Sequence, residues 1–120
     1  MEDFKIIARL LAAIYAIEDK GQMDMALVDP RVLKTTQEKR DQIALKLEKD
    51  KYIEGLRIID GIDGQREPVI MWEHSNPKIT IKGLEYIDGN DSMKNAVKEI
   101  KDIAISIAAQ AVTNVIMTKM

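Results

Sequence analysis

The stretch Thr35–Ile59, TTQEKRDQIALKLEKDKYIEGLRII, decides the fold because its apolar periodicity changes partway along. In its first half, the inward positions recur at helical spacing, namely Ile43, Ala44 and Leu47. From Tyr52 onward the spacing becomes that of a strand. Thr35 followed three residues later by Glu38 forms a capping-box pattern, which predicts that the helix begins at Thr35. The stretch therefore predicts a capped helix, a tight turn and an apolar strand.

The residues after this stretch predict a β-hairpin and a further helix. The sequence DGIDG at 60–64 is a turn signal, and Glu67–Glu73 reads as the returning strand. Within that strand, Trp72 is expected to pack against the core or the wing rather than to stack on bases. A short strand is expected at Lys78–Thr80, and Thr80 has the side chain of a helix cap.

The residues before it predict one long helix and one short one. Residues 3–19 form a helix that ends at Gly21, and residues 23–33 form a helical turn or two. The long helix carries two apolar stripes about 100° apart. The first stripe is Phe4, Ile7, Leu11 and Ile14, and the second is Ile6, Leu10, Ala13 and Ile17. Because a small core accepts one stripe, the other needs a cover, either the carboxy-terminal helix or a second subunit.

Three helices followed by a hairpin and a helix make an α+β fold that is mainly helical, a winged helix-turn-helix with a long C-terminal helix. We expect a winged-helix domain over residues 1–90 and a packing or dimerisation helix over 91–120, with Asp91 as its cap. The dimer interface predicted from the two ends of the chain comprises Leu10, Ile17, Ala104, Ile107, Ala108, Ala111 and Val115. The alternative is that part of this helix packs on residues 3–19 of the same subunit.

Composition excludes several kinds of chemistry. The 120 residues include no cysteine and one histidine, His74, which has no partner at the spacing of a catalytic pair. Asp60 and Asp63 lack the further ligands of a calcium loop. We therefore predict no enzyme activity, cofactor or metal. The uncharged run before Thr118 is too short and too polar to span a membrane, and the amino terminus lacks a secretion signal, which predicts a cytoplasmic protein.

Charge is distributed unevenly along the chain. The net charge is −2, whereas residues 31–57 carry eight basic and five acidic side chains. The interleaved acids are also typical of an ordinary solvated helix face. If this segment reads DNA, the side chains at the start of the helix contact base edges, and three further basic side chains contact the backbone. The first group is Thr36, Gln37, Lys39 and Arg40, and the second is Lys46, Arg57 and Arg66.

In the run KLEKDKYIEGLRI, in the hairpin after it and in the run NPKITIKGLEYIDGNDSMKNAVKEIKDI, the chain resembles a known family. This is the YjcQ-like family of small winged-helix proteins from bacteria and phages. The resemblance covers roughly residues 3–103. Its signature is Tyr52-Ile53 followed by Gly55, then Ile79–Gly83, then Tyr86-Ile87. The sequence departs from the pattern at Lys51, where a glycine usually precedes the tyrosine. A non-glycine residue with positive φ is therefore expected there.

The resemblance implies the fold well and function only by analogy. Two hypotheses from different classes follow. One is a homodimeric phage or prophage regulator that binds double-stranded DNA. The other is a protein-interaction module on the same scaffold, such as a phage modulator of a host protein, which the acidic flanks of the chain favour.

Overall fold

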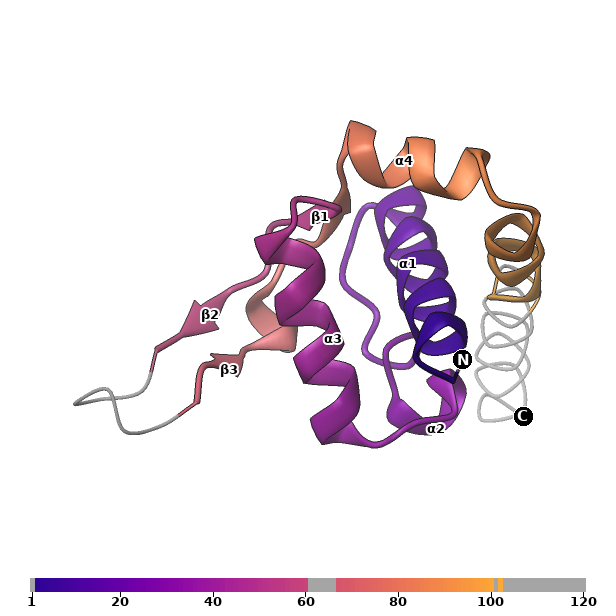
Figure 1. The fold of residues 1–120 in the computed structure, drawn as a ribbon. Helices are drawn as coiled ribbons and strands as arrows, with labels where there is room; N and C mark the ends of the chain where they lie inside the picture. The colour runs from indigo at the N-terminus through magenta and orange to yellow at the C-terminus, as the bar shows by residue number, and fades with distance from the viewer. Residues whose placement is uncertain (1, 61–66, 101, 103–120) are drawn as a thin grey trace, which may run out of the picture.

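The computed structural model describes residues 2–60, 67–100 and 102, and it has the winged-helix order predicted from the sequence (Figure 1). The helices are α1 (Glu2–Lys20), α2 (Pro30–Leu33), α3 (Gln37–Lys49) and α4 (Ile81–Asp88), with a further helix over residues 91–100. The strands are β1 (Ile53–Glu54), β2 (Ile58–Ile59), β3 (Val69–Ile70) and β4 (Lys78–Ile79), with a 3₁₀ turn η2 (Trp72–His74). The prediction of an α+β, mainly helical fold is confirmed.

Two short antiparallel pairs form the sheet region. Strands β2 and β3 pair with Ile59 opposite Val69, so the predicted hairpin is confirmed. This hairpin is the wing, and it extends away from the helices on the far side of α3 (Figure 1). Strand β1 pairs with β4, with Ile53 opposite Ile79. The Ile79 amide also donates to Glu18 Oε2 at 3.1 Å, which fastens this second pair to α1.

The returning strand is shorter than predicted. It ends at Ile70, and residues 72–74 form η2 instead of continuing to Glu73. The cause is Ser75, which is buried and closes the turn. Its hydroxyl donates to the Met71 carbonyl at 2.8 Å and accepts from the Arg57 amide at 2.9 Å. Because the turn faces inward, Trp72 is 3% exposed and packs in the core, as expected.

Helix α1 is buried along most of both apolar stripes, with Phe4 and Ile7 partly exposed. It lies between α3 and the helix that begins at residue 91 (Figure 1), and that helix contributes buried Met93, Ala96 and Ile100. Leu10 and Ile17 are 0% and 2% exposed within the chain. The prediction that these two residues form a dimer interface is wrong, because the chain itself covers the second stripe. Ala104, Ile107, Ala108, Ala111 and Val115 lie outside the described residues.

Two of the predicted helix caps shift by one residue. Lys34 has φ +59°, and the Thr35 amide donates to the Pro30 carbonyl to close α2. Thr35 therefore cannot begin α3, and Thr36 caps it instead, with its Oγ1 accepting from the Lys39 amide at 3.1 Å. Similarly, the side chain of Asn90, not Asp91, accepts from the amides that begin the last helix. The predicted caps at Thr80 and Gly21 are confirmed.

Glycines permit two close approaches between the second strand pair and its neighbours. A Cβ atom on Gly55, which has φ +89°, would lie 2.1 Å from the Asn76 carbonyl oxygen. A Cβ atom on Gly83 would lie 2.3 Å from the Tyr52 carbonyl oxygen. Any larger residue would therefore push β4 or α4 off the end of α3. This explains physically why these two motif positions hold glycine.

The end of α3 is a Schellman motif with a non-glycine residue in the left-handed position. The Tyr52 amide donates to the Leu47 carbonyl at 2.9 Å, and the Lys51 amide donates to the Glu48 carbonyl at 3.0 Å. Lys51 has φ +67°, as expected from the missing glycine. A left-handed conformation costs an L-residue about 1–2 kcal/mol.

Replacing Lys51 with glycine should therefore stabilise the protein. The relief of strain exceeds the extra chain entropy of glycine, so we expect Lys51→Gly to raise the free energy of unfolding by about 0.5–1 kcal/mol in urea titrations. The matched control is Lys46→Gly in the body of α3, which should lower it by about 1 kcal/mol. If Lys51→Gly destabilises as much as Lys46→Gly does, residue 51 is not strained.

Candidate nucleic-acid interface

The four side chains predicted to read bases do not form one exposed set. Gln37 is exposed in the first turn of α3. The Thr36 hydroxyl is engaged as the helix cap. Lys39 is half-buried on the side of α3 that faces α1. Arg40 is buried, at 5% exposure. Of the four, Gln37 therefore has the clearest access to a DNA groove.

Arg40 belongs to a buried network instead. Its Nη1 donates to the Val28 carbonyl at 2.8 Å, and its Nε donates to Asp41 Oδ1 at 2.9 Å. The same carboxylate oxygen accepts from Trp72 Nε1 at 2.8 Å, and the guanidinium carbon lies 5.1 Å from the centre of the Trp72 ring. The prediction that Arg40 reads base edges is wrong, because its guanidinium is buried. A buried guanidinium needs this carboxylate and carbonyl, and both lie inside the domain.

The three predicted backbone contacts are also separated. Lys46 is exposed on the α1 side of α3, whereas Arg57 is exposed at the base of the wing, on the other side of that helix. The Arg57 amide is held by Ser75, which fixes its main chain but leaves its side chain at the surface. Arg66 lies outside the described residues.

A basic cavity, which the sequence reading missed, lies at the start of α3. Its volume is about 470 Å³, and it is lined by Lys5, Ile6, Arg9, Lys34, Thr35, Thr36 and Lys39. Four cationic side chains and two threonines thus meet at a helix N-terminus, where the helix dipole also favours an anion. In the sequence, Lys5 and Arg9 are one helical turn apart, which would have indicated a basic face of α1. The net negative charge of residues 1–30 concealed it.

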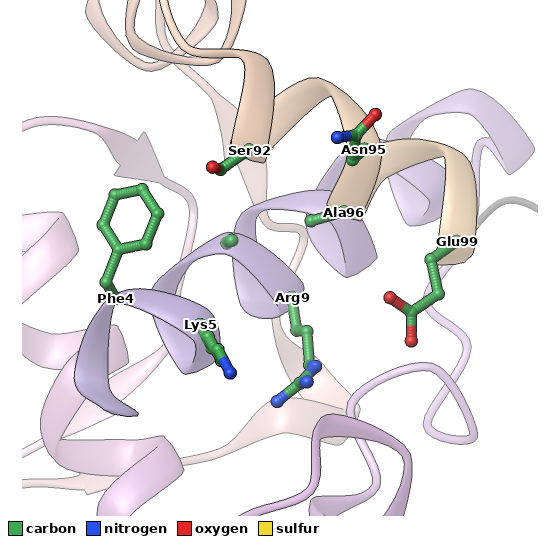
Figure 2. A pocket seen from close by; sticks show the side chains of 8 residues that line it. Phe4, Lys5, Arg9, Ser92, Asn95, Ala96 and Glu99 are labelled. Carbon is green, nitrogen blue, oxygen red and sulfur yellow. The ribbon is translucent and has the colours of Figure 1, made fainter. Parts of the chain in front are cut away.

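A second cavity of about 300 Å³ borders this basic surface between α1 and the last helix. Figure 2 shows Lys5 and Arg9 extending from α1, with Glu99 directed toward the same space from the opposite helix. Ser92 and Asn95 complete the polar side of that helix in the cavity. Glu99 therefore limits the positive field on this side, whereas the described residues that line the cavity at the start of α3 include no carboxylate.

The side of α3 that faces the wing is acidic. Asp41 and Glu48 lie two turns apart on it, and Glu54 follows in β1. Burial raises the pKa of Glu48, an effect that the nearby Glu54 charge increases and that hydrogen bonds to the Leu56 and Gly55 backbone oppose. The cations that line the basic cavity therefore lie toward α1, whereas Asp41, Glu48 and Glu54 lie toward the wing.

The described part of the chain forms neither a cluster of metal-ligating side chains nor a membrane-spanning helix. Within residues 2–60, 67–100 and 102, no three side chains of the metal-ligating types come together. His74, the single histidine, is exposed in η2. Across the same ranges, every helix is too short or too polar to cross a lipid bilayer.

The helix order, the paired wing strands and the position of α3 define the class of the molecule, a winged-helix protein. The model of the YjcQ protein family matches residues 4–104, which is most of the chain. The protein therefore belongs to the YjcQ family, as its motifs indicated. No curated protein and no solved structure matches it.

Proposed function

We propose that this YjcQ-family protein is a non-enzymatic DNA-binding module, a transcription regulator of the kind encoded by phages and prophages. The observation that carries the proposal is the basic cavity at the start of α3. Four cations surround the N-terminus of the helix in the recognition position, although the chain as a whole has a net charge of −2. Such a concentration of positive charge suits the phosphate backbone of DNA.

In this proposal the cavity positions the protein and exposed α3 side chains read sequence. Lys5, Arg9, Lys34 and Lys39 contact phosphates, which fix orientation without reading bases. Gln37 and Gln42 are exposed on α3, and a glutamine amide pairs well with adenine in the major groove. Arg40 contributes indirectly by packing over Trp72 in the turn after the wing, not by touching DNA.

The salt dependence of binding tests this arrangement. Removing two phosphate contacts should reduce the slope of log affinity against log salt by about 2. We therefore expect a Lys5→Gln, Arg9→Gln variant to bind the protein's own upstream region more weakly and with this shallower slope in mobility-shift titrations. The matched control is Lys49→Gln with Lys98→Gln, two exposed cations outside the cavity.

An unchanged slope in the cavity variant would contradict phosphate binding by the cavity. Wild-type binding that disappears at physiological salt and does not distinguish sequences would contradict a regulator.

A second candidate function, docking on another protein, is favoured by the wing. Ile59 and Val69 lie opposite each other on it and are 49% and 55% exposed. The flanking Asp60 and Glu67 are acidic, so this surface would repel DNA phosphates. An exposed apolar pair with an acidic border is typical of a protein contact.

If the wing binds a protein, wild-type chain should capture one stoichiometric partner from nuclease-treated host lysate. A variant with Ile59→Thr and Val69→Thr should lose that partner, because both apolar contacts are removed and the β propensity of the strands is kept. Thr80→Ser at the cap of α4 is a control away from the wing. Equal capture by all three proteins, or by none, would contradict this candidate.

A further inference from the structure

A separate groove lies between α1, α3 and α4. Its volume is about 390 Å³, and its lining residues are Phe4, Ile7, Ile43, Lys46, Leu47, Asp50, Tyr52 and Tyr86. This volume falls at the small end of the range for small-molecule sites, which are apolar with a few polar groups. None of the described residues that line this groove also lines the basic cavity at the start of α3.

Aromatic side chains are concentrated in this groove. The chain has five aromatic residues, and three of them, Phe4, Tyr52 and Tyr86, line it. All three are partly exposed, whereas Ile43 and Leu47 behind them are buried. The groove therefore offers an apolar floor with accessible ring faces and edges, which suits the insertion of another flat ring.

The two tyrosines are held in place. Their ring centroids are 5.4 Å apart at an interplanar angle of 58°. Lys82 Nζ lies 4.5 Å from the centre of the Tyr52 ring and donates to the Asp50 carbonyl at 2.9 Å. Burial and the neighbouring Tyr52 raise the pKa of Tyr86, so its phenol stays neutral and can donate a hydrogen bond.

Among the described residues that line the groove, Lys46 and Asp50 carry one charge of each sign. Lys46 and Asp50 are exposed and stand one turn apart on α3, so their side chains begin about 5–6 Å from each other. A ligand that carries only an anion would be repelled by Asp50, and one that carries only a cation would be repelled by Lys46. The charges are complementary to a ligand with both an ammonium and a carboxylate.

We propose that this groove binds a small aromatic zwitterion, with the ring against Phe4, Tyr52 and Tyr86, the carboxylate at Lys46 and the ammonium at Asp50. Such a ligand would contact α3 directly, from the side opposite the wing. Binding can be measured without DNA, so failure of this proposal is distinguishable from failure of the proposed function.

The test is a titration of ¹⁵N-labelled full-length protein with three probes of similar size, followed by NMR. The probes are L-phenylalanine, which is a zwitterion, 3-phenylpropionate, which is an anion, and phenethylamine, which is a cation. L-phenylalanine should give saturable shifts centred on Ile7, Ile43, Tyr52 and Tyr86. Each single-charge probe should bind about two- to fivefold more weakly, as expected for the loss of one exposed ion pair.

Substitutions of groove residues test whether the probes bind in the groove. Lys46→Gln should weaken the binding of L-phenylalanine about two- to fivefold, because one ion pair to the carboxylate is lost. It should not weaken the binding of phenethylamine, which has no carboxylate. Lys49→Gln, outside the groove, should leave the affinity for both probes unchanged. Tyr86→Leu should weaken all three probes through the loss of ring contact, with the folded state checked by the amide spectrum.

Four results would overturn the proposal. The first is the absence of saturable shifts up to a ligand concentration of about 10 mM. The second is a set of shifts centred on residues outside the groove, and the third is an equal affinity for all three probes. Concentration-dependent self-association that shifts the same groove residues would also overturn it, because a second copy would then be the occupant.

Discussion

The hydrogen bonds that join Arg40, Asp41 and Trp72 are the constraint on which the rest of the structure depends. One carboxylate oxygen of Asp41 accepts from both the Arg40 guanidinium and the Trp72 indole, and Arg40 also donates to Val28. These contacts connect the loop before α2, the first two turns of α3 and the turn after the wing. Because a buried charge without its partner costs about 3–5 kcal/mol, the loop, helix and wing base are expected to hold one relative arrangement.

This network also determines where function can reside. Arg40, near the start of α3, is committed to the interior, where its charge is paired with Asp41 on the wing side of the helix. The positive charge available to a phosphate comes from α1 and from the turn before α3, through Lys5, Arg9 and Lys34. A basic cavity at the helix N-terminus and an aromatic groove farther along the same helix then flank α3 on its α1 side. The proposed DNA contact and the proposed ligand contact therefore both act through α3.

Local sequence patterns predicted the helices and strands well, but they could not predict contacts between residues distant in sequence. Helical spacing identified α1 and α3, and alternation with a turn signal identified the hairpin, because these signals lie within a few residues of one another. The cap of α3 was predicted one residue early because the left-handed Lys34 uses the Thr35 amide. The burial of Arg40 depends on Trp72 and Val28, which are distant in sequence, so nothing near Arg40 indicated it. The net charge of residues 1–30 is negative, so it concealed the basic side chains of Lys5 and Arg9. The sequence alone also could not show whether Leu10 and Ile17 are covered by the same chain or by a second copy.

Hydrogen exchange at the indole of Trp72, the chain's single tryptophan, is the most direct measurement of the central claim that this network fastens the wing base to α3. In the wild-type protein the Nε1 proton should exchange slowly, at a rate close to that of global unfolding. In Asp41→Ala, which removes the shared acceptor, exchange should be at least about tenfold faster, whereas Glu38→Ala on the exposed face of α3 should change it little. Wild-type exchange as fast as that of a free indole, or exchange unaffected by Asp41→Ala, would contradict the claim.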